Sequence, residues 1–270
     1  MDWQEKKNKL NKMLGDFCRE DVCIAFSGGV DSSLLLYLLG KLSKERDTRV
    51  YAVTFDTELH PAGDLEIARE IAQSTETIHH VIHLDELENP EILENPPDRC
   101  YLCKKMLFER LLHFACEKNV EYILEGTNLD DRSIYRPGLR AVAELGIKSP
   151  LAECGFTKAE VRRYAGECGL SVSRRPSTPC LATRLPYHTH ITREVLSKIE
   201  QGETYLRKQG FYNVRMRVHG DVIRLELDSR DLPKALEQSR EITEKIKKLG
   251  FSYVTLDLEG FRSGSMDEIF

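Results

Sequence analysis

The chain has 270 residues, of which 39 are basic and 44 are acidic, so its formal net charge is −5. An acidic balance argues against broad, non-specific binding to nucleic acid, although it leaves room for a local basic site. No apolar run approaches the roughly 20 residues that span a bilayer. Residues 1–12 are polar and charged, so we expect a cytoplasmic protein with no secretory signal.

The first part of the chain alternates strand-like and helix-like patterns. Short apolar runs predict buried strands over residues 21–26, 49–55, 77–84 and 121–125. Helices are expected over residues 3–17, 34–42, 64–74 and from Asp98 to about residue 118. Residues 85–97 contain three prolines and are expected to be mostly loop. This alternation predicts an α/β fold, with a Rossmann-like parallel sheet covered on both faces.

The order of expected helices and strands changes in the second part of the chain. Thr157 and Glu160 form a capping box that begins a helix ending near residue 168. Residues 174–190 carry three prolines and read as a loop or linker. Helix, hairpin, helix and strand patterns then follow over residues 192–209, 212–227, 230–249 and 253–258. We therefore expect a first domain over 1–185 and a small α+β domain over 186–270.

A glycine pair separates the first strand from the helix that follows it, in the string Ser27-Gly-Gly-Val-Asp-Ser32. Such a loop exposes backbone N–H groups, and the helix N-terminus adds a potential that favours an anion. An aspartate beside phosphate calls for a cation between them, so Asp31 suggests Mg²⁺. The loop has no lysine, which excludes the Walker pattern. The alternative is a plain strand–helix turn, which the full six-residue string disfavours.

This string resembles the signature of the PP-loop ATP pyrophosphatases. The resemblance implies that ATP is cleaved between its α and β phosphates, so that AMP is placed on a substrate oxygen. It also implies that the nucleotide site includes residues from the ends of the first, second and fourth strands. These residues are Ala25, Phe26, Ser27, Gly28, Gly29, Asp31, Ser32, Ser33, Val53, Thr54 and Gly126.

Strings farther along the chain narrow the resemblance. They occupy residues 125–131 (EGTNLDD), 135–140 (YRPGLR), 149–153 (SPLAE) and 179–187 (PCLATRLPY). Together they resemble the LarE family, the sulfur transferases that make the nickel-pincer cofactor of lactate racemase. The resemblance covers nearly the whole chain. It implies that the substrate is a pyridinium mononucleotide with two ring carboxylates, one of which is adenylated and converted to a thiocarboxylate.

The resemblance also assigns residues to this chemistry. Cys180 matches a cysteine that, in some members, gives up its own sulfur and becomes dehydroalanine, and Arg184 lies in the same string. Arg215 and Arg217 would bind the substrate phosphate, which suits the donor fork of arginine. Their alternation fits a solvated sheet face equally well. Glu203, Glu226 and Asp231 match acidic site residues only by approximate alignment, and exposed surface charges would account for them as well.

A pair of cysteines, Cys100 and Cys103, stands at the expected N-terminus of a helix, an end that favours thiolate. Four readings compete: a structural pair, a redox dithiol, half of a zinc site completed by His188 or His190, and a cluster site shared with Cys180. Some LarE-family members and related RNA-thiolating enzymes hold a [4Fe–4S] cluster with three cysteines. By this resemblance we favour the cluster, whose open iron would carry a sulfide.

Other functions compete with sulfur transfer to a small nucleotide. A related PP-loop enzyme could thiolate tRNA, but the acidic charge and the small, not notably basic second domain disfavour an RNA substrate. A regulator that has lost its chemistry is disfavoured by the presence of Asp31 and Cys180. The resemblance implies a homo-oligomer, and the reaction would call for an external sulfide or persulfide donor.

Overall fold

The computed structural model describes residues 2–133, 136–176, 178–262 and 264–266. The chain forms two compact units. The first contains Met1–Thr57, Ala62–Asp85 and Asp98–Ser177, and the second contains Glu58–Pro61, Glu86–Pro97 and Thr178–Phe270. The expected division at residue 185 put Cys180 and Arg184 in the first domain, whereas they pack within the second unit.

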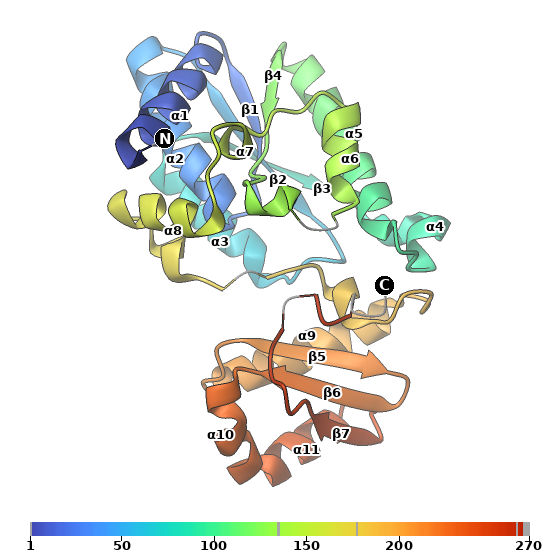
Figure 1. Ribbon diagram of the computed structural model, residues 1–270. Coiled ribbons are helices and arrows are strands. Elements are labelled where there is room, and N and C mark those ends of the chain that lie inside the picture. The colour runs from blue at the N-terminus through green and yellow to red at the C-terminus, as the bar shows by residue number, and fades with distance from the viewer. Residues whose placement is uncertain (1, 134–135, 177, 263, 267–270) are drawn as a thin grey trace. The chain divides into compact units, whose positions relative to one another are not determined.

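A parallel sheet of four strands forms the centre of the first unit (Figure 1). Its strands are β1 (Val22–Ala25), β2 (Val50–Asp56), β3 (Ile78–His83) and β4 (Tyr122–Leu124), in the order β3-β2-β1-β4. Each neighbouring pair is parallel. The predicted α/β class is confirmed, and each predicted strand occurs within two residues of its expected ends.

Helices cover both faces of this sheet. They are α1 (Trp3–Phe17), α2 (Val30–Arg46), α3 (Gly63–Ser74), α5 (Arg99–Glu117), α6 (Gly138–Glu144), α7 (Pro150–Glu153) and α8 (Lys158–Glu167). Alternate side chains of β1 enter different cores, as the pleat of a strand requires. Val22 and Ile24 pack with residues of α1, α2 and α8, whereas Cys23 packs with residues of α5. Figure 1 shows these two helical layers.

Some elements of the first unit differ from the sequence-based expectation. Helix α2 begins at Val30, four residues before the predicted start, because its first turn follows the glycine pair directly. The short helices α6 and α7 were not predicted, since four to seven residues carry too little periodicity to recognise. The capping box of Thr157 and Glu160 is present as predicted.

The second unit contains a three-stranded mixed sheet. Its elements are α4 (Pro90–Leu93), α9 (Arg193–Lys208), β5 (Val214–His219), β6 (Val222–Leu227), α10 (Leu232–Glu237), α11 (Ser239–Lys247) and β7 (Tyr253–Leu256). Strand β6 lies in the middle, antiparallel to β5 and parallel to β7. The single helix expected over 230–249 is two helices that meet at Gln238, whose backbone (φ −93°, ψ 11°) departs from helical values. Helix α4 forms within the segment that was expected to be mostly loop.

Across the described part of the chain, no helix is long and apolar enough to cross a membrane.

The N-terminal helix is fixed to α8 by an aromatic cluster. The Trp3 ring lies edge-on to the rings of Phe156 and Tyr164, with 5.9 Å between centroids in each case. Its indole N–H donates to the Glu167 carboxylate over 3.0 Å. Edge-to-face aromatic pairs add stability beyond the area they bury, and a partnered indole N–H leaves no polar group unsatisfied.

We therefore expect Trp3→Ala to lower the free energy of unfolding by about 2 kcal/mol, because it removes a large ring from a packed cluster. Trp3→Phe should cost less than half as much, since a ring stays against Phe156 and Tyr164. Urea denaturation followed by circular dichroism measures both values. Equal losses in the two variants would contradict the aromatic contribution.

Candidate active site

The phosphate loop connects β1 to α2 and uses Gly28 in a left-handed conformation (φ +69°). A Cβ at Gly28 would lie only 3.2 Å from the backbone nitrogen of Ala68, so a side chain there would be both strained and crowded. Gly29 is the N-cap residue of α2, and no side chain caps this end of the 17-residue helix. The first turn of α2 therefore offers its N–H groups to an anion.

Serine hydroxyls line the same turn. The Ser32 hydroxyl donates to the Gly29 carbonyl over 3.2 Å and accepts from the Ser27 N–H. The Ser33 hydroxyl is buried and has no hydrogen-bond partner among the described residues. Because buried hydroxyls are nearly always partnered, an orphaned one at a phosphate loop fits a bound ligand.

Gly126 brings the end of β4 against the first turn of α2. A Cβ at this position would lie 3.0 Å from the Ser32 nitrogen and 3.1 Å from the Asp31 Cβ. The predicted phosphate-loop residues and Gly126 are therefore adjacent, while their contact with a nucleotide stays a prediction.

The end of β2 is joined to the residue before the loop. The Phe26 N–H donates to the Val53 carbonyl over 2.8 Å, and the Thr54 hydroxyl donates to the Phe26 carbonyl over 2.7 Å. The Thr54 oxygen therefore accepts from His79 Nε2, 2.9 Å away, which makes Nε2 the protonated ring nitrogen. Burial, followed by the Arg69 and His80 charges, lowers the pKa of His79. Neutral His79 thus donates a hydrogen bond to Thr54, at the end of β2 where adenine is expected. Sequence reasoning gave His79 no role.

Asp31 is held by two donors. Its Oδ1 accepts from the Asn128 amide over 3.1 Å, and its Oδ2 accepts from the Lys158 ammonium. The Asn128 amide is oriented by its own oxygen, which accepts from the Asp130 and Asp131 N–H groups. Each oxygen of the carboxylate expected to face Mg²⁺ therefore already accepts from one protein donor.

Glu125 connects the end of β4 to α5. Its buried carboxylate accepts from the hydroxyls of Ser149 and Thr127 over 2.5 and 2.8 Å, and from Lys104 of α5 over 3.1 Å. Burial by itself would raise the pKa of Glu125, but the Lys104 charge and these hydrogen bonds lower it overall. The carboxylate stays ionised and ties α5 to the nucleotide edge of the sheet.

The cysteine pair lies on α5. Cys100 is exposed and Cys103 is half-buried. The Arg99 Nη2 lies 3.6 Å from the Cys100 sulfur. Cys18, Cys23 and Cys154 are buried, as expected of packing residues, and burial raises the pKa of Cys23 to about 12. Cys116 is exposed.

In the second unit, the turn that carries Cys180 is held by Arg184. The Arg184 Nη1 donates to the carbonyls of Pro179 and Cys180 over 2.8 and 3.0 Å. Its other two nitrogens form a bidentate pair with Glu203 of α9, and both side chains are buried. Arg184 was predicted to be catalytic, but these contacts use its donors to position the Cys180 backbone.

Arginines of β5 continue the same network. Arg217 donates to the Thr183 carbonyl over 2.8 Å and to Glu226 over 2.9 Å, and its buried Nε has no partner among the described residues. Arg215 and Arg217 are each 4% exposed. A solvated sheet face is therefore wrong as an account of these arginines.

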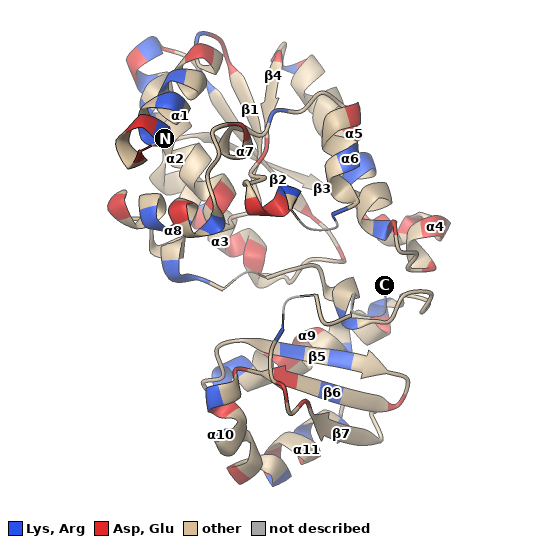
Figure 2. Ribbon diagram, viewed as in Figure 1, with Lys and Arg blue, Asp and Glu red and all other residues tan. Residues whose placement is uncertain are grey.

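Cations outnumber carboxylates in this network. The arginines are Arg184, Arg207, Arg215, Arg217 and Arg224, and the carboxylates that they contact or approach are Glu203, Glu226 and Asp257. Figure 2 shows basic residues along β5 and an acidic one on β6. Burial lowers the pKa of Arg215 to about 10, with the Arg184 charge acting in the same direction. Arg215 is still charged at neutral pH, so the surplus favours an anion.

The three acidic residues thus have different surroundings. Glu203 and Glu226 are wholly buried, so exposed surface charge is wrong as an account of them. Asp231 is the N-cap residue of α10, and its carboxylate makes no cap hydrogen bond there.

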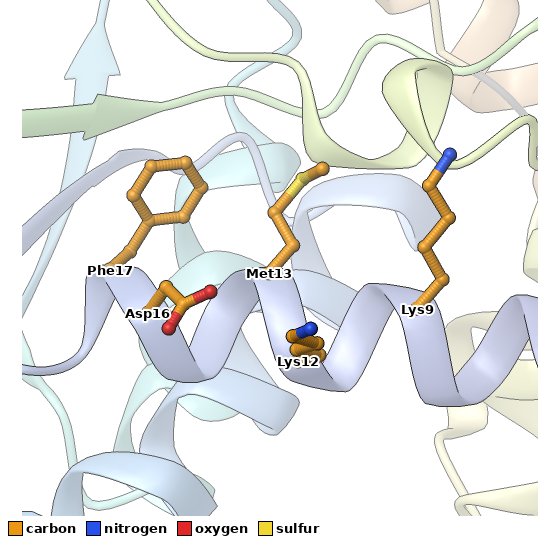
Figure 3. A pocket seen from close by; sticks show the side chains of 5 residues that line it. All are labelled: Lys9, Lys12, Met13, Asp16 and Phe17. Carbon is orange, nitrogen blue, oxygen red and sulfur yellow. The ribbon is translucent and has the colours of Figure 1, made fainter.

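A cavity of about 350 Å³ lies on α1 and involves none of the predicted site residues. Figure 3 shows Lys9, Met13 and Phe17 pointing from one side of this helix, with Lys12 and Asp16 beside them. One helix supplies all five lining residues, so the cavity is a surface depression and not a closed pocket.

Comparison with known proteins identifies the family of the chain. The family model for asparagine synthase matches residues 17–103, which include the phosphate loop. A pyridinium-3,5-bisthiocarboxylic acid mononucleotide synthase of Lactiplantibacillus plantarum is 36% identical over 264 residues, covering 97% of this chain and 94% of its own. The chain belongs to the LarE-like family of PP-loop ATP pyrophosphatases. This LarE-like protein is therefore an ATP-dependent enzyme of the sulfur-transferase type.

Other relatives are either unassigned or more distant. An uncharacterized protein of Synechocystis is 35% identical over 268 residues, covering 98% of both chains. A tRNA-specific 2-thiouridylase of Caldanaerobacter subterraneus is 26% identical over 225 residues, covering 67% of the LarE-like chain and 61% of its own.

Sequence reasoning missed several residues of the LarE-like site. Asn128 and Ser149 lie in the 125–131 and 149–153 strings, so the resemblance was a signal for them, whereas nothing in the sequence singled out Lys158 or Lys104. Tyr135, quoted in another string, lies outside the described residues.

The proposed iron–sulfur cluster finds no support in the structure. Within residues 2–133, 136–176, 178–262 and 264–266, no three His, Cys, Asp or Glu side chains gather in a way that could hold a metal ion. Cys100 and Cys103 belong to the first unit and Cys180 to the second. The cluster stays a prediction.

Gly28→Ala should reduce pyrophosphate formation from ATP about 100-fold, because a Cβ would displace the loop against Ala68. Gly146→Ala is the matched control. Gly146 has the same φ of +69°, but a Cβ there meets nothing within 4 Å. Both variants should lose about 1–2 kcal/mol of stability from the left-handed backbone, and only Gly28→Ala should lose activity. Pyrophosphate release and urea denaturation measure the two effects, and equal activity in both variants would be the contrary result.

Arg184→Met should destabilise the protein by about 3–5 kcal/mol, because it leaves the Glu203 carboxylate buried without its bidentate partner. Arg207 pairs with the same carboxylate from a more exposed position, with its side chain 32% exposed. Arg207→Met should therefore cost about 1 kcal/mol. The difference can be read from chemical denaturation of the two variants. A larger loss in Arg207→Met would show that Arg184 does not anchor the turn.

Proposed function

We propose that this enzyme adenylates a ring carboxylate of a pyridinium biscarboxylate mononucleotide and converts it to a thiocarboxylate, in nickel-pincer nucleotide synthesis. Similarity over the full length to the mononucleotide synthase supports this substrate class. One geometric observation carries the proposal further. Within the second unit, the turn that bears Cys180 is bonded to the same strand that carries Arg215 and Arg217.

That strand suits the phosphate of a mononucleotide. The Arg217 Nε is buried without a partner among the described residues, and the surrounding arginines exceed the carboxylates. A phosphate would supply both an acceptor and the missing negative charge. A cationic site close in the fold to a sulfur-bearing residue fits a substrate that carries both a phosphate and a reacting carboxylate.

The reaction then proceeds in two balanced steps. The carboxylate oxygen attacks the α-phosphorus of ATP, which gives an acyl adenylate and pyrophosphate. The N–H groups of the first turn of α2 would stabilise the pyrophosphate as it leaves. A sulfur nucleophile next attacks the acyl carbon and expels AMP, because adenylation has turned a poor leaving oxygen into a good one.

Two sources of this sulfur are compatible with the residues present. We propose that Cys100, Cys103 and Cys180 hold a [4Fe–4S] cluster, which would supply an iron for an exogenous sulfide. The alternative is that Cys180 itself attacks, and that β-elimination then leaves the thiocarboxylate and dehydroalanine. This second route consumes the protein and needs only Cys180.

Thiolation of tRNA is a second candidate because of the similarity to a 2-thiouridylase. The net charge of −5 and the full-length similarity to the mononucleotide synthase favour the small substrate.

The test is to combine the purified protein, the pyridinium biscarboxylate mononucleotide, Mg²⁺–ATP and sulfide, and to measure pyrophosphate and thiocarboxylate. Cys180→Ala should still release pyrophosphate, because adenylation precedes sulfur attack, but should form no thiocarboxylate. Cys116→Ala, which removes an exposed cysteine of the first unit, should retain both activities. Sulfur transfer by Cys180→Ala, or no pyrophosphate release from the unaltered protein, would refute the proposal.

The intact mass of the polypeptide after one turnover separates the two sulfur sources. Loss of one sulfur and two hydrogens means that Cys180 is consumed, whereas an unchanged mass supports exogenous sulfide. Iron content after anaerobic reconstitution provides the complementary measurement. A colourless, iron-free protein would exclude the cluster.

A further inference from the structure

Lys158 is the first residue of α8 and reaches the phosphate loop from outside it. Its own N–H donates to the Asp130 carboxylate over 2.8 Å, and the capping box of Thr157 and Glu160 fixes the backbone around it. Val161 and Ala165 bury α8 in the same core as α2. The Lys158 backbone is therefore rigidly placed, while its side chain, 35% exposed, ends at Asp31.

Both oxygens of the Asp31 carboxylate already accept from protein groups, and the donor on one of them is a cation. Its Oδ1 faces the Asn128 amide, which is itself fixed by the Asp130 and Asp131 N–H groups, and its Oδ2 faces the Lys158 ammonium. Asn128 is 1% exposed and cannot easily turn away. If Asp31 ligates Mg²⁺, the Oδ2 is the oxygen that must be released, and the Lys158 ammonium is the group that must leave.

We propose that Lys158 and Mg²⁺ exchange at Asp31: Lys158 neutralises the carboxylate before Mg²⁺–ATP binds, and its ammonium then moves to the phosphate oxygens. Mg²⁺ binds a carboxylate oxygen at about 2.1 Å, so an ammonium on that oxygen would repel it strongly. The lysine side chain is a flexible stem with a point charge, and is suited to such a move. Lys158 is thus a phosphate-binding residue that α8 supplies to the phosphate loop. The loop itself contains no lysine.

The exchange explains why a cationic side chain lies against Asp31 when no ligand is bound. With no ligand bound, an unpartnered carboxylate would oppose the arrival of ATP, and Lys158 cancels that charge. When Mg²⁺–ATP binds, the metal takes over the cancellation and the ammonium meets new negative charge on the phosphates. This inference rests on ATP binding at the loop, and does not depend on the sulfur acceptor in the proposed function.

The experiment measures binding of α,β-methylene-ATP by titration calorimetry over a range of Mg²⁺ concentrations, without a sulfur acceptor. In Lys158→Met, the dissociation constant at saturating Mg²⁺ should rise about tenfold, as expected for a lost charge-assisted hydrogen bond. The Mg²⁺ concentration that gives half-maximal binding should at the same time fall about threefold, because the competitor for Asp31 is gone. A purely structural ion pair would not lower the Mg²⁺ requirement.

Lys6→Met is the matched control. Lys6 pairs with Glu160 of the same helix over 2.7 Å, away from Asp31. This variant should lose stability but keep the affinity and the Mg²⁺ requirement of the unaltered protein. If Lys158→Met does not fold, Lys158→Arg decides. The guanidinium fork should hold Asp31 more firmly and raise the Mg²⁺ requirement. An unchanged Mg²⁺ requirement in Lys158→Met, or in Lys158→Arg where only that variant folds, overturns the exchange.

Discussion

The close approach of β4 to the first turn of α2 is the constraint on which the nucleotide site depends. Only a glycine at position 126 allows it, because a Cβ would lie 3.0 Å from the Ser32 nitrogen. Since β1, β2 and β4 are parallel neighbours, their carboxyl ends lie at one edge of the sheet. Parallel α/β sheets place ligands at that edge. Here it gathers Phe26, Thr54 and Gly126 around the N-terminus of α2.

The two units differ in how their ionised side chains are paired. In the first unit, the ionised groups of the site are already paired within the protein: Asp31 with Lys158, and Glu125 with Lys104. A charged ligand must therefore displace or join these pairs. In the second unit, the buried Arg184, Arg215 and Arg217 outnumber the buried Glu203 and Glu226, which leaves a surplus of positive charge. The first arrangement suits an exchange of cations, and the second suits recognition of a phosphate.

Arg184 illustrates how a residue of a signature string can hold the backbone of its neighbours in place. Sequence resemblance placed it beside Cys180 and favoured a catalytic role. The structure buries its side chain completely and uses its donors on Glu203 and on the carbonyls of Pro179 and Cys180. A bidentate ion pair fixes the direction of the guanidinium, and the guanidinium in turn fixes the backbone that carries the thiol.

Local pattern was sufficient for the α/β class, the four parallel strands and the phosphate loop, because alternating periodicity and a glycine pair are read from neighbouring residues. It was insufficient for α6 and α7, which are too short to show a period, and for the break between α10 and α11 at Gln238. Surface exposure was also misjudged from pattern. Arg215 and Arg217 alternate as residues of a solvated face do, yet both are buried, and Arg217 pairs with Glu226.

The sequence by itself therefore determined the chemistry: an ATP-cleaving loop at Ser27–Ser32, a candidate sulfur-bearing cysteine at position 180, and the family to which both belong. The tertiary structure decided the contacts between residues far apart in the chain. Asp31 meets Asn128 and Lys158 across 97 and 127 positions, and no periodicity or spacing encodes such a meeting. The physical reason is that side-chain partners at a site are set by which elements pack together, and packing is a property of the whole fold.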